Sequence, residues 1–339
     1  MNSRELLNRK LAGEKVERLL FCPAVYEHKA RLINSSPSII AQDVDRLAEA
    51  LAAEYETYRP DVLTVGVDIY NVEAQSLGAE VVFSDSMDEV PNLRQRILEK
   101  PDFSKLPKVN EALEKGRIRM FVEAARRVSK MFGSEVHVRG GLSGPYSIAA
   151  SLMGIEPLIM ASFTDPESLA DLLDHCSGLA FEFGRLYIEA GCGVCLFDSQ
   201  AVPPLLSPDM FRKMILPHVK KLFRDYKASG ADLIEYVTGG DTTAISGELF
   251  ETGADIILSD FSSDMRVFIK KSQRYNTLIR RNISPISIEA GIDAADEEIR
   301  AVKTAASENN NIIAGTGVLS CNVSPDNIIK TRKILLDEE

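Results

Sequence analysis

The densest group of polar side chains in the sequence follows an apolar run that begins at Val62. Residues 68–73 read Asp-Ile-Tyr-Asn-Val-Glu, which places four hydrogen-bonding side chains within six residues. A carboxylate, a phenol and an amide at one point of the chain are suited to orienting a small polar ligand. We therefore expect Asp68, Tyr70 and Asn71 to bind substrate. The alternative is that Asn71 only forms a turn and Tyr70 only packs beneath a loop.

Other apolar runs also end in acidic or basic side chains. Asp198, Glu235 and Asp241 end or follow such runs, and positioned carboxyl groups can transfer protons in catalysis, so we expect these three to be catalytic. Arg139 and Asn282 stand at the ends of two further runs, and we expect them to bind substrate. Because gathered carboxylates raise one another's pKa values, a metal ion, a cationic substrate or arginines must offset their charge.

Eight short runs rich in β-branched residues would carry these side chains, and most of them are followed by an amphipathic segment of helical length. Such alternation predicts parallel strands joined by helices, and eight strands close a barrel. The runs are apolar on both faces, as strands covered by helices should be. We predict an α/β fold, a (β/α)₈ TIM barrel with a short N-terminal helical extension, as a single domain over residues 1–339. The first run ends near Tyr26, and the others begin at Val62, Val136, Gly193, Leu233, Asp255, Thr277 and Asn311.

Three predicted helix starts support this alternation of strands and helices. Ser207-Pro208-Asp209 and Ser324-Pro325-Asp326 follow predicted strands, and each combines a capping residue with a proline suited to the first helical position. Asp165-Pro166-Glu167 repeats the pattern without a preceding strand.

The segment from Ser84 to Pro107 holds three prolines and has weak periodicity. We interpret it as an excursion over the barrel mouth, and thus as a candidate lid. Active sites of such barrels lie at the carboxyl ends of the strands.

Composition excludes several classes of protein. The 339 residues include 39 Lys and Arg against 50 Asp and Glu, for a net charge of −11, which disfavours binding to nucleic acid. The polar start is unlike a secretory leader, and no stretch reaches the ~18 unbroken apolar residues of a membrane span. Five cysteines are an odd number and fit reduced thiols. We expect a cytoplasmic protein without a membrane segment.

Taken in order, several short motifs make the sequence similar to the uroporphyrinogen decarboxylase superfamily, which also contains corrinoid-dependent methyltransferases. The resemblance covers nearly the whole chain and implies the barrel fold already predicted. It is carried by Gly78-Ala79-Glu80, Ser143-Gly144-Pro145-Tyr146, the run containing Asp198 with Ser207-Pro208 and Leu216-Pro217-His218, Gly240-Asp241-Thr242, Arg281-Asn282-Ile283-Ser284-Pro285 and Ser324-Pro325-Asp326-Asn327.

Two departures from the superfamily bear on function. The decarboxylases carry an arginine-rich signature after the first strand that holds porphyrin carboxylates, whereas this chain has Tyr26-Glu27-His28 there. The thiol methyltransferases hold zinc with a His-x-Cys pair after the fifth strand, and Val237 and Gly239 occupy those positions here. The resemblance implies that Cys321 corresponds to the third ligand of that zinc site. Thr316 is the alternative match to this position, depending on where the gap in the alignment is placed.

A different zinc site is possible. The last strand and the first two strands are neighbours in a closed barrel, so Cys321, His28 and Glu73 could converge, with Glu27 as a substitute for His28. A thiolate, an imidazole and a carboxylate are acceptable zinc ligands that leave a fourth position open. The alternative is a site without metal, in which Glu73 only forms hydrogen bonds.

The leading functional prediction is a zinc-assisted methyltransferase that moves a methyl group between a small methylated substrate and a corrinoid. The resemblance implies that the corrinoid is carried by a separate partner protein, since the chain lacks an Asp-x-His-x-x-Gly motif. The first alternative is a decarboxylase like uroporphyrinogen decarboxylase, with Asp68 or Asp198 steering a cation. The second is a barrel that binds a small molecule without catalysis.

Overall fold

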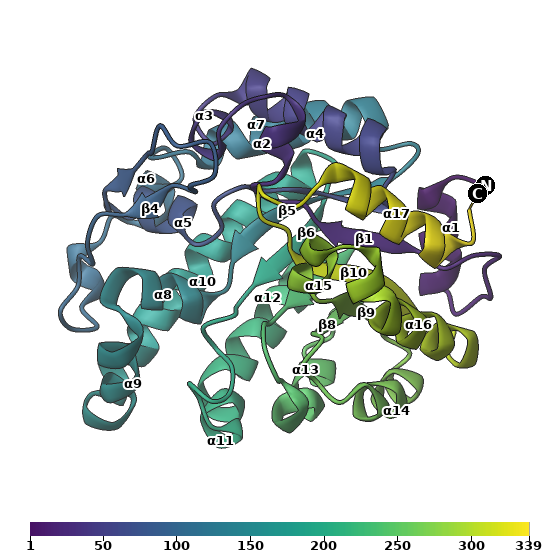
Figure 1. The fold of residues 1–339 in the computed structure, drawn as a ribbon. Coiled ribbons are helices and arrows are strands. Elements are labelled where there is room, and N and C mark those ends of the chain that lie inside the picture. The colour runs from purple at the N-terminus through teal and green to yellow at the C-terminus, as the bar shows by residue number, and fades with distance from the viewer. Residues whose placement is uncertain (339) are drawn as a thin grey trace.

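Eight parallel strands form the centre of the computed structural model, which describes residues 1–338 (Figure 1). The order of strands in the sheet is β1-β10-β9-β8-β7-β6-β5-β2. From β2 to β10 each strand lies beside the next strand of the sheet along the chain, and β10 lies beside β1, so the predicted barrel is confirmed. The strands are β1 (Phe21–Ala24), β2 (Val62–Val65), β5 (His137–Ser143), β6 (Gly193–Phe197), β7 (Ile234–Val237), β8 (Ile256–Ser259), β9 (Leu278–Ile283) and β10 (Ile312–Val318).

The ring of strands closes between β1 and β2 through one aspartate. The backbone N–H of Asp61 donates to the carbonyl of Phe21 at 2.8 Å, and the Asp61 carboxylate accepts from the Phe21 N–H at 2.7 Å. Arg18 pairs with the same carboxylate at 2.6 Å. These contacts join the two strands where no regular ladder forms between them.

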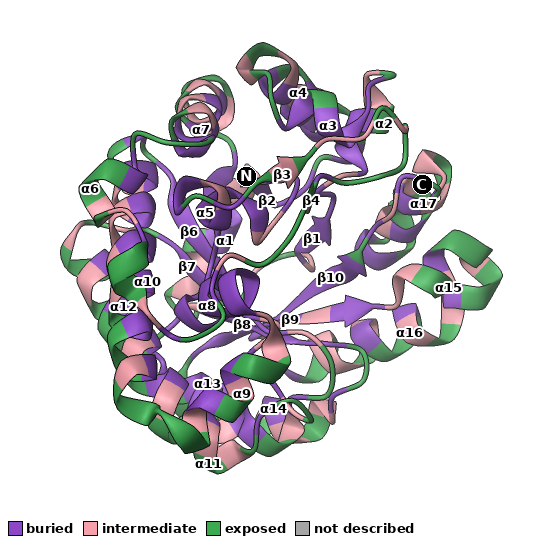
Figure 2. Cartoon of the chain, turned by 90° about the vertical axis from the view of Figure 1, so that its left-hand side faces the viewer, coloured by how far each residue is buried: buried purple, intermediate pink, exposed green. Residues whose placement is uncertain are grey.

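A helix after each strand covers the outside of the barrel. Figure 2 shows buried strands in the centre, with the helices around them turning their exposed faces outward. The covering helices are α4 (Val44–Tyr58), α7 (Ile118–Phe132), α10 (Pro166–Glu189), α12 (Leu216–Ala228), α13 (Ser246–Glu251), α14 (Met265–Tyr275), α16 (Ile292–Glu308) and α17 (Pro325–Leu336).

Shorter helices lie between the carboxyl ends of the strands and these covering helices. They are α2 (Lys29–Leu32), α3 (Pro37–Ile40), α5 (Asn71–Ser76), α6 (Val109–Ala112), α8 (Pro145–Met153), α9 (Ile155–Thr164), α11 (Pro208–Met210) and α15 (Pro285–Ala290), together with η1 (Phe103–Lys105), the π-helical turn η2 (Phe211–Ile215) and η3 (Thr243–Ile245).

The N-terminal extension is a helix, as predicted, and it seals one end of the barrel. Helix α1 (Ser3–Leu11) begins with a capping box between Asn2 and Glu5. Its Leu6 and Leu7 are buried against apolar side chains from the amino ends of the strands, including Val62. The opposite end, where the strands finish, is therefore the open end.

The predicted excursion, residues 84–107, begins in the loop of a short antiparallel hairpin between β3 (Val81–Val82) and β4 (Asn92–Leu93). Val90, in the loop between these strands, lines the cavity at the barrel mouth. The loop thus lies where a lid would.

Two of the predicted helix starts are capped by their own side chains. The Ser207 hydroxyl accepts from the Met210 N–H at 3.2 Å, and the Asp165 carboxylate accepts from the Ser168 N–H at 3.3 Å. Helix α17 starts at the predicted proline without such a bond from Ser324.

No single helix in residues 1–338 has the length and apolar character needed to cross a membrane. Helices α8 and α9, bent by 107° between them, meet that requirement only as a pair and only by length and composition.

Candidate active site

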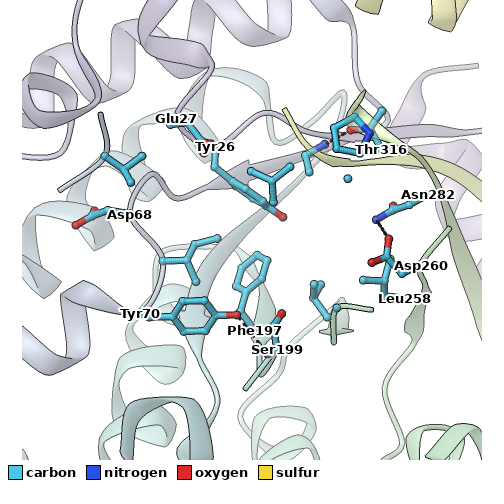
Figure 3. A pocket seen from close by; sticks show the side chains of 18 of the residues that line it. Tyr26, Glu27, Asp68, Tyr70, Phe197, Ser199, Leu258, Asp260, Asn282 and Thr316 are labelled. Carbon is cyan, nitrogen blue, oxygen red and sulfur yellow. Dashed lines mark hydrogen bonds between the residues drawn. The ribbon is translucent and has the colours of Figure 1, made fainter. Parts of the chain in front are cut away.

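A cavity of about 430 Å³ opens at the carboxyl ends of the strands (Figure 3). Its walls are mainly apolar, and Tyr26 and Phe197 pack edge to face with ring centres 5.3 Å apart. Figure 3 shows the Tyr26 hydroxyl pointing into the cavity. The lining residues are Ala24, Tyr26, Glu27, Val67, Asp68, Ile69, Tyr70, Asn71, Val90, Phe197, Ser199, Val237, Gly239, Leu258, Asp260, Phe261, Arg280, Asn282, Pro285, Thr316, Gly317 and Val318.

Three buried charges lie at the base of the cavity, and one of them, Arg280, forms part of its floor. Glu235 on β7 pairs with Arg139 on β5, and its other oxygen lies 2.9 Å from Nε of Arg280 on β9. Arg139 also donates to the Thr64 hydroxyl at 2.9 Å. Arg139 and Glu235 are fully buried and Arg280 is 2% exposed. One buried carboxylate is therefore the counterion of two buried arginines. Of the three, only Arg280 lines the cavity.

A glycine makes room for Arg280. A Cβ atom on Gly315 would lie 2.7 Å from Cγ of Arg280 and 2.8 Å from Oδ1 of Asn282, closer than such contacts allow. Glycine at this point of β10 lets the arginine stem and the amide lie against the backbone. Nη1 of Arg280 and Oδ1 of Asn282 are buried without a hydrogen-bond partner in the part of the chain that the structure describes.

Two carboxyl groups lie nearer the mouth. Burial raises the pKa of Glu27 to about 6, so this group holds a proton more readily than an exposed glutamate does. Asp260 accepts hydrogen bonds from the N–H groups of Gly240 and Phe261 at 3.0 and 3.1 Å, and from Nδ2 of Asn282 at 3.2 Å. Of the two, Glu27 is the one suited to donate a proton.

The predicted polar segment 68–73 lies at the cavity, with Tyr70 and Asn71 in its wall. Tyr70 has φ +81°, a conformation that is strained for a bulky residue and is found mainly at functional sites. Its hydroxyl accepts from the Ser199 N–H at 3.3 Å. Nδ2 of Asn71 donates to the carbonyl of Pro91 at 2.6 Å, which ties the hairpin loop to the mouth. Whether these residues bind substrate stays a prediction.

Asp68 also lines the cavity, but its carboxylate is already paired. Arg117 donates to both of its oxygens, at 3.0 and 2.7 Å, and the pair is buried. Burial raises the pKa of Asp68, while Arg117 opposes that rise. The pair anchors the start of α7 beneath the mouth and leaves Asp68 little capacity for a ligand.

The three acids predicted to be catalytic are not among the residues that line the cavity, and their catalytic role stays a prediction. Glu235 is held in the buried floor by Arg139 and Arg280. Asp198 points away from the cavity and accepts from the N–H and hydroxyl of Ser147 on α8, at 3.0 and 2.7 Å. Asp241 is exposed and accepts from the Thr243 N–H at 2.9 Å. For Asp198 the reason is strand geometry, because side chains of successive residues point to opposite faces and Phe197 faces the cavity. Glu235 faces inward but lies deeper than the cavity, and Asp241 follows the end of β7.

The three predicted zinc ligands are bound to other groups. Both ring nitrogens of His28 are used, at 2.8 Å from the Ser320 carbonyl and 2.7 Å from the Tyr58 hydroxyl. The Glu73 carboxylate accepts from the N–H and hydroxyl of Ser143 at 2.6 and 2.8 Å, as in the metal-free alternative.

Cys321 does not complete a metal site either. Its sulfur contacts the Glu27 carbonyl at 3.6 Å, and burial raises the pKa of the thiol to about 11, which disfavours the thiolate that zinc requires. Within residues 1–338, no group of three or more His, Cys, Asp or Glu side chains could hold a metal ion. The residues present therefore do not fit zinc as predicted.

Arg280 was missed by the sequence analysis, although the sequence contains a signal for it. Side chains two residues apart on a strand point to the same face. Since Asn282 was expected in the mouth, Arg280 should lie below it on the same face of β9. Its neighbour Arg281 points outward and donates to the carbonyls of Asp260 and Ser263 at 2.6 and 2.9 Å. Arg281 thus shapes the loop that carries Asp260.

Comparison with curated proteins finds relatives of two kinds. The chain is 25% identical over 249 residues to the methylcobamide:CoM methyltransferase MtbA of Methanosarcina acetivorans, covering 73% of this chain and 71% of that protein. The MtbA protein of Methanosarcina mazei is 24% identical over 82% of this chain and 80% of its own length. The uroporphyrinogen decarboxylase of Streptomyces coelicolor is 32% identical over 54% of this chain and 48% of its own.

Solved structures give the same fold. A methyltransferase from Methanosarcina mazei superposes with a TM-score of 0.85 at 18% identity, covering 99% of this chain and 98% of that one. The family model described as uroporphyrinogen decarboxylase (URO-D) matches residues 2–337. The chain belongs to the uroporphyrinogen decarboxylase family, an enzyme family whose members include both methyltransferases and decarboxylases.

Proposed function

We propose that the chain is a methyltransferase that moves a methyl group between a small methylated substrate and the cobalt of a separate corrinoid protein. Three features of the cavity together support this proposal. It is mainly apolar, it contains an acid with a raised pKa, and it opens through a rim of exposed apolar side chains. The similarity to the MtbA proteins favours a methyltransferase over the other chemistry of the family.

The apolar rim suits the docking of a partner over the mouth. Val90, Phe261, Ile286 and Val318 come from four different loops or element ends, and their exposed fractions lie between 42% and 77%. Val90, Phe261 and Val318 also line the cavity, so the rim and the cavity wall are continuous. Apolar surface gathered in this way is typical of an interaction site.

Glu27 would protonate the leaving atom. When a methyl group leaves an oxygen or nitrogen atom, the electron pair of the broken bond stays on that atom, which must take up a proton to leave readily. The raised pKa of Glu27 keeps a fraction of this carboxyl protonated near neutral pH. Its place at the mouth puts that proton near the end of the substrate from which the methyl group departs.

The partner's corrinoid would supply a nucleophilic cobalt that accepts the methyl group. The chain's own residues would hold the substrate, with Tyr26 and Phe197 excluding water and Asn282 offering an amide. We assign no step to zinc, because the predicted ligands are engaged elsewhere.

The test is methyl transfer from small methyl ethers, methylated amines and methylated thiols to reduced cobalamin, followed by the absorption change as methylcobalamin forms. We expect one class of donor to react, and we expect Glu27→Gln to slow the reaction by about 10²–10⁴-fold. Glu297→Gln, which changes an exposed acid on α16, is the matched control and should react normally.

Failure of every donor class, together with release of CO₂ from uroporphyrinogen, would replace this proposal with decarboxylation. Failure of both assays, with a ligand still bound in the cavity, would indicate a barrel that binds without catalysis.

A further inference from the structure

We propose that the cavity is built for a ligand with a single carboxylate, and that Arg280 receives that carboxylate at the cavity floor. The inference deepens the proposed function, on which it rests for the identity of the ligand as a methyl donor. The anionic end would point down to Arg280, and the methylated end would point out to the mouth. The site predicted from the sequence did not contain this arginine.

The first argument is a count of buried charges. Arg139 and Arg280 carry two positive charges against the one negative charge of Glu235, so the floor has a net charge of +1. Arginine cannot release its proton in a protein, so the excess positive charge persists at every working pH. An uncompensated buried charge is costly, and a ligand that neutralises it gains the corresponding energy.

Other charged groups near the floor do not cancel this excess. Lys29 is buried and pairs with Glu54 at 3.1 Å, so the Glu54 carboxyl contributes no net negative charge that could offset the two arginines. Asp260 lies beyond the end of β8 and is held by Asn282 and two backbone N–H groups. Glu27 follows β1 at the mouth. Both carboxylates therefore lie toward the rim, above the level of Arg280.

The second argument is the unused hydrogen-bonding capacity at the floor. Nη1 of Arg280 is buried, makes no hydrogen bond among residues 1–338, and belongs to a side chain that lines the cavity. Such an N–H is costly without an acceptor, and a carboxylate oxygen is the acceptor that suits guanidinium best. Gly315 keeps the space that the arginine stem occupies, so the side chain is positioned before a ligand arrives.

The shape of the cavity limits the rest of the ligand. A volume of about 430 Å³ is in the range of small-molecule sites. Above the floor the wall is formed by Ala24, Tyr26, Phe197, Val237 and Leu258, which offer apolar surface and one phenol hydroxyl. A ligand with an apolar body and one carboxylate matches both parts, whereas a cationic ligand would meet like charge at the floor.

The experiment measures binding by titration calorimetry without a corrinoid protein. The probes are benzoate, benzamide and benzylamine, which have similar size and differ in charge. We expect the unmodified chain to bind benzoate at least tenfold more tightly than either of the others. Arg280→Met should weaken benzoate binding by about tenfold to a hundredfold, because charge-assisted hydrogen bonds contribute that much, and should change benzamide binding little.

Two further variants complete the test. Arg280→Lys keeps the charge and should retain part of the benzoate preference. Arg300→Met removes an exposed arginine on α16, 77% exposed in its side chain, and should bind benzoate normally. The comparison of the three probes uses the unmodified chain, so it decides the matter even if Arg280→Met does not fold.

Equal binding of benzoate and benzylamine, no binding of benzoate, or full benzoate binding by Arg280→Met would each overturn the proposal. A benzoate preference without methyl transfer would instead remove the proposed function and leave the anion site in place.

Discussion

Replacing Glu235 with glutamine is expected to destabilise the fold rather than to remove a catalytic group. The substitution keeps the volume of the side chain and deletes its charge. Arg139 and Arg280 would then be two buried cations without a counterion, since Glu235 is the carboxylate that pairs with both. Neither can relieve the repulsion by losing a proton, because guanidinium stays charged in proteins.

The size of the effect follows from the contacts. Removing one partner of a buried ion pair costs about 3–5 kcal/mol in the free energy of unfolding. The unfolding entropy of ~2.1 cal/mol/K per residue gives ~0.7 kcal/mol/K for a chain of this length. Dividing the first figure by the second predicts a melting temperature lower by ~4–7 °C.

The assay is thermal unfolding followed by calorimetry and circular dichroism. Glu297→Gln is the control, because it deletes an exposed charge on α16. Adding Arg280→Met to Glu235→Gln should restore part of the lost stability, since one uncompensated cation is removed. Two results would refute the reasoning. The first is a Glu235→Gln variant that melts with the parent, and the second is a double variant that is less stable than Glu235→Gln alone.

Three further predictions follow from the same geometry. Methyl transfer should slow as pH rises above about 6, the pKa of Glu27, because the proton donor is then ionised, and Glu27→Gln should flatten the pH–rate profile. Asn71→Ala should raise the Michaelis constant without unfolding the chain, because the bond to Pro91 that holds the hairpin loop is lost; unchanged kinetics would contradict this. The free energy of unfolding should fall between pH 4.5 and about 7, because burial raises the pKa of Glu54 from 4.5 to about 7 and the folded state holds that proton longer. Denaturant titrations at several pH values would check this, and a stability that increases over the same range would contradict it.

The fold could be predicted because its signal is local. Runs such as those beginning at Val62 and Gly193 are apolar on both faces, which distinguishes buried parallel strands from half-exposed ones. The helix starts at Pro166, Pro208 and Pro325 carry a proline that suits the first turn of a helix. Neither signal depends on residues far away in the sequence, so strands and helix starts can be predicted from one sequence without knowledge of the fold.

The site could be predicted only in part, because it depends on the direction and depth of each side chain. Cys195 and Phe197 face the inside of the barrel, so Asp198 faces out toward Ser147. Glu235 lies on the inner face, but two residues deeper than Val237, and so it meets arginines instead of substrate. The zinc prediction placed three side chains by strand order alone, whereas metal ligation requires distances of about 2.0–2.3 Å.

The sealed lower end of the barrel has a kinetic consequence. Helix α1 packs Leu6 and Leu7 across the amino ends of the strands, and the charged floor lies above it. Substrate therefore enters and product departs at the end where a partner would dock. On the proposed function, addition would then be ordered, with the small molecule first and the partner protein second. An excess of partner protein should slow turnover by occupying the empty enzyme, which steady-state inhibition patterns can measure.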